Sequence, residues 1–192
     1  MRLSQPRIPP VTDEGATDEQ RALLAPLHYG DVIPNLYRTL VNHPPAMRAF
    51  TGWGDHILRG GNTLPARERE LLVIRIGWLC RAGYEWVAHV DIGREAGLEE
   101  DEINRIDVGS TADGWNADDR ALLAAAEELH ADHFVSDATW EALNARWTRQ
   151  QCMDVIFTVS HYMQVCMVLN TFGIQLDRDR TLPDKARRAW NL

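Results

Sequence analysis

Several kinds of sequence feature are missing from this chain of 192 residues, and each absence excludes a class of protein. No run of about 18 apolar residues occurs, so no membrane span is expected. The net charge is −8 and no block of Lys or Arg stands out, which argues against a nucleic-acid partner. The segment MRLSQPRIPPVTDEGATDEQ lacks the apolar region of a secretory signal peptide. We therefore expect a cytoplasmic protein without nucleic-acid or membrane partners.

Residues suited to disulfide or metal chemistry are also few. The three cysteines, Cys80, Cys152 and Cys166, form no C-x-x-C pair, and their odd number argues against a disulfide framework. Their simplest interpretation is that they are small buried hydrophobic residues. His130 and His133 have a spacing that could serve a metal, but no third ligand is visible, so no metal is expected. No cofactor motif is visible either.

What the chain does contain predicts a helical protein. Hydrophobic residues make up 45% of the sequence, which is enough for a core. Apolar residues recur at helical spacing, Thr17 and Gln20 form a capping box, and no strand-like alternation or Asn-Gly turn appears. We predict an all-α fold with one domain over residues 18–176. An extended arm, residues 1–17, precedes the domain, and a charged tail, residues 177–192, follows it and is expected to be loose.

One segment is ambiguous on its own pattern. The sequence LLVIRIGWL, residues 71–79, is β-branched and almost continuously apolar, as in a buried strand. Thr63 and Pro65 would suit the start of a helix before it, and the run exceeds ordinary strand length. These two features favour a helix.

Residues 64–103, LPARERELLVIRIGWLCRAGYEWVAHVDIGREAGLEEDEI, carry the pattern L-x-x-R-x-R-E-L, then Y-E-W-x-x-H, then A-G-L. This block resembles the carboxymuconolactone decarboxylase family, which also contains the AhpD-like alkylhydroperoxidases, and weaker similarity extends over residues 35–175. The resemblance implies a helix for residues 71–79 and an AhpD-like multi-helix bundle. It also implies a homo-oligomer joined through buried helices, as a trimer or hexamer, with a dimer left open. The residues that carry it are Leu64, Arg67, Arg69, Glu70, Leu71, Tyr84, Glu85, Trp86, His89, Ala96, Gly97 and Leu98.

The resemblance also shows what this chain has lost. The redox branch of the family carries cysteines seven and four residues before the motif histidine, where this sequence has Ala82 and Glu85. Cys80 lies two residues too early for either position. A dithiol peroxidase needs an attacking thiolate and a resolving cysteine, so AhpD-type disulfide chemistry is not expected. The relay glutamate of that branch, nineteen residues before the histidine, is retained as Glu70.

The surviving residues point to acid–base chemistry. Glu85 and His89 are four apart on a predicted helix, so their side chains can touch, and a carboxylate raises the pKa of a histidine. We expect His89 to be the general acid or base and Glu85 and Glu70 to orient it or relay its proton. The leading hypothesis is a cofactor-independent lyase or isomerase acting on a small carboxylated lactone or unsaturated acid. The candidate substrate-binding residues are Tyr84, Trp53, Arg75 and His161.

Other interpretations stay open. A Glu–His pair four apart is common on surface helices, where it contributes only about 0.2–0.5 kcal/mol. Tyr84 suits packing, and Arg75, inside an apolar run, suits a core ion pair. Two other functions compete with the lyase: a peroxidase that uses a lone cysteine such as Cys80, and a non-catalytic oligomer that binds a small molecule.

Overall fold

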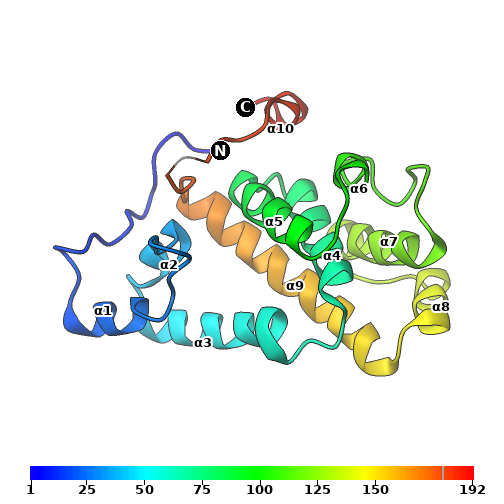
Figure 1. The fold of residues 1–192 in the computed structure, drawn as a ribbon, viewed down its shortest axis with the longest axis horizontal. Helices are drawn as coiled ribbons and strands as arrows, with labels where there is room; N and C mark the ends of the chain where they lie inside the picture. The colour runs from blue at the N-terminus through cyan, green and yellow to red at the C-terminus, as the bar shows by residue number, and fades with distance from the viewer. Residues whose placement is uncertain (179) are drawn as a thin grey trace.

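The computed structural model describes residues 1–178 and 180–192, and every regular element in that part of the chain is a helix. Helix α9, the longest, runs through the middle of the molecule (Figure 1), and α4, α5, α7, α8 and η1 pack against it. The all-α prediction is confirmed. The elements are α1 (Asp18–Leu24), α2 (Asn35–Leu40), α3 (Pro44–Asp55), the π-helix η1 (His56–Gly60), α4 (Ala66–Leu79), α5 (Gly83–Glu95), α6 (Glu100–Arg105), α7 (Ala117–Asp132), α8 (Asp137–Arg146), α9 (Arg149–Phe172) and α10 (Asp184–Trp190).

The ambiguous apolar segment forms most of α4. Every residue from Glu70 to Gly77 is buried, because α4 packs against α5, α7 and α9. A helix covered on several sides has no solvent-exposed face for polar residues. Its sequence therefore lacks the apolar periodicity of a surface helix. This explains why the sequence pattern alone left a strand open.

Hydrogen-bonding caps define the ends of the helices that flank the core. Thr17 and Thr148 each form a capping box, at the starts of α1 and α9. Helix α9 ends at Gly173, whose φ of 71° lies in the left-handed region that glycine adopts without strain. Local sequence therefore sets the limits of the longest helix.

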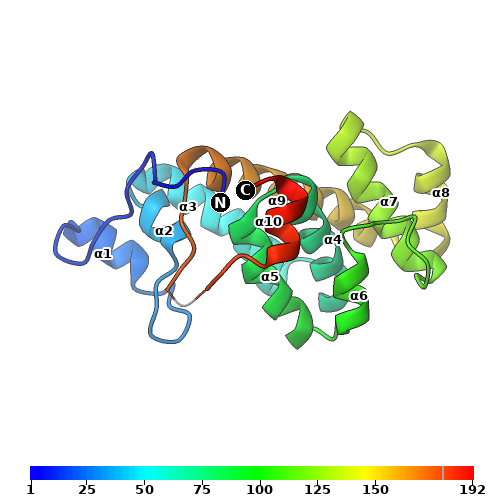
Figure 2. The same cartoon turned by 90° about the horizontal axis from the view of Figure 1, so that it is seen from above.

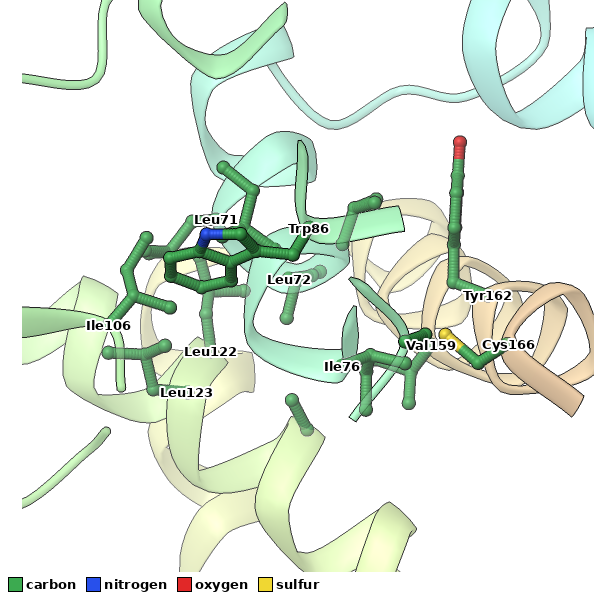
Figure 3. Packing of buried hydrophobic residues seen from close by; sticks show 14 of the residues in the cluster. Leu71, Leu72, Ile76, Trp86, Ile106, Leu122, Leu123, Val159, Tyr162 and Cys166 are labelled. Atoms are coloured by element: carbon green, nitrogen blue, oxygen red, sulfur yellow. The ribbon is translucent and has the colours of Figure 1, made fainter. Parts of the chain in front are cut away.

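A single large hydrophobic cluster lies between α4, α5, α7 and α9. On one side of it, Trp86 of α5 lies over Leu71 of α4 and near Leu122 of α7 (Figure 3). On the other side, the Cys166 side chain of α9 is directed toward Ile76 of α4 (Figure 3). This packing fixes how α4 and α5 lie relative to α9.

Both chain ends pack against their own domain and lie close together (Figures 1 and 2). The extended N-terminal arm is held where the backbone N–H of Arg7 donates to the carbonyl of Phe172 over 2.8 Å. The expectation of a loose tail was wrong. Its residues 184–190 form α10, and the Trp190 ring packs on Trp78 with centroids 4.9 Å apart. Trp190 shares this burial with Ala186 and with Leu182 just before the helix, so apolar contacts dock the charged helix.

Helix α9 is long and apolar enough to cross a membrane by length and composition, and it is the one such helix among the described residues. However, 56% of its most apolar window is buried inside the molecule. Burial by neighbouring helices accounts for its composition, as in the core helix of a globular domain.

Candidate active site

His89 lies between two carboxylates. Its Nδ1 is 2.6 Å from Oε2 of Glu70, and its Nε2 is 3.0 Å from Oε1 of Glu85. Glu70 comes from α4, whereas Glu85 and His89 share one face of α5. All three side chains are buried. Each of the two helices therefore places one carboxylate against one nitrogen of the imidazole ring.

The approach of α4 to α5 depends on glycine. A Cβ atom at Gly93 would lie 2.8 Å from Cδ1 of Ile74, which is closer than real contacts allow. A Cβ atom at Gly77 would lie 3.4 Å from the backbone nitrogen of Trp86. The turn between the helices passes through Arg81, which has a φ of 51°. Small residues at the crossing thus let Glu70 reach the ring of His89.

The half-buried Arg69 joins these three buried side chains, and the charges alternate along the chain of contacts. Nε of Arg69 donates to Oε1 of Glu70 over 3.2 Å, and Oε2 of the same carboxylate receives the Nδ1–H of His89. With both glutamates ionised and the histidine protonated, the four side chains carry no net charge. A buried ionic group is tolerated when its members compensate one another in this way.

The electrostatic environment keeps His89 protonated. Burial by itself lowers the pKa of an imidazole, but the carboxylates of Glu85 and Glu70 outweigh this effect and raise the pKa of His89 to about 10. At neutral pH the ring is therefore an imidazolium, and both of its nitrogens carry protons.

The contact between His89 and Glu85 is looser than that with Glu70. Although Nε2 and Oε1 form a close ion pair, Oε1 of Glu85 has no donor in hydrogen-bond geometry among the described residues. Oε1 of Glu85 is therefore a buried acceptor that lacks a hydrogen-bond donor among the described residues.

A cavity of about 340 Å³ adjoins this group, and Glu85 and His89 form part of its wall. Tyr162 of α9 lies edge-on to His89, with ring centroids 5.0 Å apart, and also lines the cavity. The remaining wall comes from α2, α3, η1, the segment around residues 27–34, and Asp177, Arg178 and Arg180. Its size suits a small molecule.

His161 also faces this cavity, one residue before Tyr162. Its side chain is buried, its Nδ1 has no hydrogen-bond partner among the described residues, and burial lowers its pKa to about 4. Gly54 of α3 lies beside the ring, since a Cβ atom there would be at an ordinary contact distance, 3.5 Å, from Nε2. The cavity thus presents a neutral imidazole from α9 in addition to the charged one from α5.

The other predicted binding residues differ in position. Tyr84 lines the cavity, but its hydroxyl donates to Oδ2 of Asp177 over 2.5 Å, which ties it to the C-terminal segment. Trp53 and Arg75 are not among the residues that line the cavity. Trp53 stacks on the ring of His56, with centroids 4.9 Å apart. Neither residue is therefore placed to bind a molecule beside His89.

Arg75 has a structural role instead. Its guanidinium pairs with Glu127 at 2.9 Å and donates to the carbonyl oxygens of Ile106 and Asp107. These contacts join α4 to α7 and to the segment after α6. These contacts engage the charged guanidinium. Burial nevertheless lowers the pKa of Arg75, because its effect exceeds the opposing effect of the Glu127 carboxylate.

Sequence reasoning missed several cavity residues. Tyr37 of α2 and Arg59 of η1 line it, and burial raises the pKa of Tyr37 to about 12. Nothing in the local sequence of either residue indicated this position. Tyr162 did leave a signal, because it interrupts the apolar run of α9 next to His161. π-Helices such as η1 often occur at functional sites, but sequence periodicity does not reveal them.

The cysteines do not line this cavity, and Cys80 is only partly buried at the end of α4. Among the described residues, no three His, Cys, Asp or Glu side chains gather as a group that could hold a metal ion. The chemistry visible at the cavity is therefore that of the imidazoles, carboxylates, phenols and guanidinium groups already named.

Comparison with known proteins places this arrangement in a wider context. The sequence model of the Carboxymuconolactone decarboxylase family matches residues 44–128, which include Glu70, Glu85 and His89. No curated protein matches the chain significantly. The predicted resemblance to this family is confirmed.

Solved structures share the fold at low sequence identity. An AhpD-core, peroxidase-related protein from Ralstonia eutropha JMP134 superposes with a TM-score of 0.77 at 24% identity, covering 88% of this chain and 92% of that one. A peroxidase-related protein from Silicibacter sp. TM1040 gives 0.74 at 17% identity, covering 93% and 92%. The debrominase Bmp8, in a complex with 2,3,4-tribromopyrrole, gives 0.72 at 14%, covering 97% and 96%. These similarities show the AhpD-like fold.

Proposed function

We propose that this chain, whose residues 44–128 match the model of the carboxymuconolactone decarboxylase family, is a cofactor-independent enzyme that transfers protons on a small substrate. The observation that carries the proposal is the imidazole of His89, held between Glu70 and Glu85 at the wall of a cavity. The reaction class we favour is a lyase or isomerase. The substrate class is a small carboxylated lactone or a related unsaturated acid.

His89 is the proton donor in this scheme. Since its pKa is raised to about 10, it enters the reaction as an imidazolium. It can give the Nε2 proton to the carbanion or dienolate carbon that develops in the substrate, while Glu70 keeps the Nδ1 proton in place. General acid catalysis of this kind is typically worth about 10²–10⁴ in rate.

Glu85 and His161 position the substrate. Oε1 of Glu85 and Nδ1 of the neutral His161 ring are buried polar atoms without a hydrogen-bond partner among the described residues. The substrate's own carbonyl serves as the electron sink, so developing negative charge lies near the imidazolium. Arg59 lines the same cavity and can pair with a substrate carboxylate.

The competing functions have weaker support. A lone-cysteine peroxidase would need a thiol at the cavity, and Cys80 does not line it. A non-catalytic binding oligomer would not require His89 to be held protonated between two carboxylates. Self-association itself remains a prediction, and the exposed Met153 and Met167 on α9 are consistent with it. Light scattering of the purified protein measures the oligomer mass.

The test uses proton exchange, which does not require the natural substrate. A panel of small unsaturated acids, keto acids and lactones is incubated with the protein in D₂O, and NMR measures deuterium at the carbon next to the carbonyl. We expect His89→Asn and Glu85→Gln to lose exchange or turnover. His133→Asn is the matched control, since His133 is exposed and lies outside the cavity. Full activity in both site variants would refute the acid–base proposal.

A further inference from the structure

Tyr162 directs its hydroxyl group toward the cavity beside His89. Its ring lies edge-on to the ring of His89, with centroids 5.0 Å apart, and edge-on to the ring of His161 at 5.4 Å. The hydroxyl is directed away from Val159 and Cys166, its neighbours in the hydrophobic cluster (Figure 3). Since Tyr162 and His89 both line the cavity, the phenol and the imidazolium border the same space.

This hydroxyl lacks a hydrogen-bond partner among the described residues, yet it is not sealed off. The buried, unpaired polar atoms include Oε1 of Glu85 and Nδ1 of His161, but the Tyr162 oxygen is not one of them. An unpaired oxygen outside that group has exposed surface, and the cavity is the space that Tyr162 lines. Tyr84 differs, because its hydroxyl already donates to Asp177. The Tyr162 phenol can therefore donate to a molecule in the cavity.

The surroundings keep this phenol protonated. Burial raises the pKa of Tyr162 well above its ordinary value, and the carboxylates of Glu85 and Glu70 raise it further. The neighbouring His89 carries a positive charge at neutral pH, since its pKa is raised to about 10. A neutral O–H donor beside an imidazolium favours negative charge on an oxygen atom in the cavity.

The wall around this donor suits a planar, conjugated molecule. All four tyrosines of the chain line the cavity, together with Phe50. The Phe50 ring also lies against the ring of His161, with centroids 5.3 Å apart. Aromatic side chains pack well against flat π-systems, by stacking or edge-on. The cavity therefore combines flat apolar surfaces with a site for an oxyanion.

We propose that the Tyr162 hydroxyl is the oxyanion donor of this site and binds the enolate oxygen of the reacting substrate. The role rests on the proposed proton transfer and makes it more specific. It names the ligand class as planar, conjugated molecules that place an enolate or phenolate oxygen against Tyr162. A preorganised donor aimed at a developing oxyanion stabilises the transition state, and a phenol can serve as that donor. Tyr162 is a catalytic residue in this scheme, since it touches a reacting atom.

The step can be written for a substrate whose carboxylate is attached to the carbon next to a carbonyl group. The C–C bond to the carboxylate breaks, carbon dioxide leaves, and the electron pair moves onto the carbonyl oxygen. Tyr162 donates a hydrogen bond to that oxygen and keeps its proton. The Nε2 proton of His89 then forms the new C–H bond while the carbonyl group reforms, and water returns a proton to the ring.

The first test measures binding without turnover. The probe is 4-nitrophenol, because its anion is a planar, conjugated oxyanion and absorbs at longer wavelength than the neutral phenol. We expect the wild-type protein to bind it as the anion at neutral pH. Its methyl ether, 4-nitroanisole, has no oxyanion and should bind at least about 10-fold more weakly. Equal binding of the two probes, or no binding of 4-nitrophenol, would overturn the proposal without the need for a variant.

The second test removes the hydroxyl and keeps the ring. We expect Tyr162→Phe to weaken binding of 4-nitrophenolate about 10–100-fold and to slow deuterium exchange by about 10²–10³. Ser160→Ala is the matched control, since it removes an exposed hydroxyl of α9 that donates to the carbonyl oxygen of Phe157 and lies outside the cavity. Urea unfolding checks that both variants fold. Unchanged probe binding in a folded Tyr162→Phe protein would refute the oxyanion role.

The two proposals fail in different ways. If Tyr162→Phe weakens probe binding while no compound of the panel exchanges its protons, the oxyanion site stands and the proton-transfer function is wrong. If exchange requires His89 but neither exchange nor probe binding responds to Tyr162→Phe, the acid–base function stands and the phenol has no part in it.

Discussion

Nδ1 of His89 lies 2.6 Å from Oε2 of Glu70, although the two residues are nineteen positions apart and belong to different helices. The contact exists because α4 and α5 cross closely at Gly77 and Gly93. It adds a second carboxylate to the one that His89 already meets on its own helix. The chemical state of the ring therefore depends on packing as well as on local sequence.

Replacing Glu70 with Gln should lower the pKa of His89. One of the two nearby carboxylates is then gone, while burial still disfavours the charged ring, so we expect a fall of about 1–3 from the value near 10. NMR titration of the His89 ring measures this. The control is Glu68→Gln, one turn or less away on the same helix, whose carboxylate pairs with Arg67 rather than with His89. An unchanged His89 titration in Glu70→Gln would contradict the proposed role of Glu70.

The stability of the protein should fall as pH rises above neutrality. The pKa of His89 is about 10 in the folded state and near 6.5 when the ring is free, so the folded state binds the proton more tightly. The stabilisation that the protonated ring adds to the folded state is complete below pH about 6.5 and is lost as pH rises through 10. Urea unfolding over this range should show the decline, and His89→Gln should have a flatter profile. Parallel profiles for the two proteins would argue against a protonated His89.

His161 should produce the opposite trend on the acid side. Burial lowers its pKa to about 4, against 6.5 for a free ring, so the unfolded state takes up the proton first. The stability associated with the neutral ring is present above pH 6.5 and is lost as pH falls toward 4. We expect His161→Gln to lose less stability than the wild type over this interval. The comparison is made by urea unfolding, with His133→Gln as the exposed control. Equal acid sensitivity of His161→Gln and the wild type would count against a buried neutral ring.

Two glycine substitutions should have opposite effects on stability. Gly93→Ala would place a Cβ atom 2.8 Å from Cδ1 of Ile74 and 2.9 Å from Cδ1 of Leu98, and we expect a loss of about 1–3 kcal/mol. Gly52→Ala in α3 meets nothing within 4 Å and should stabilise the protein by about 0.5–1 kcal/mol, because alanine favours a helix. Denaturant midpoints measure both. A Gly93→Ala variant as stable as the wild type would show that α4 and α5 have room to separate.

Much of the fold was predictable because its signals are local. Capping residues fixed the starts of α1 and α9, and the family block identified α4 where its periodicity did not. The tail was mispredicted because the docking of Trp190 on Trp78 joins residues far apart in sequence. Arg75 looked like a possible substrate clamp until the structure showed it pairing with Glu127, again over a long separation.

The sequence by itself determined that Glu85 and His89 share a helix face, since a spacing of four residues places side chains together on any α-helix. It also determined that the family's cysteine pair is replaced by Ala82 and Glu85. Only the tertiary structure decided that Glu70 reaches the same ring and that His161 and Tyr162 border its cavity. These relationships depend on how helices cross, and helix crossing is set by the packing of residues that are distant in the chain.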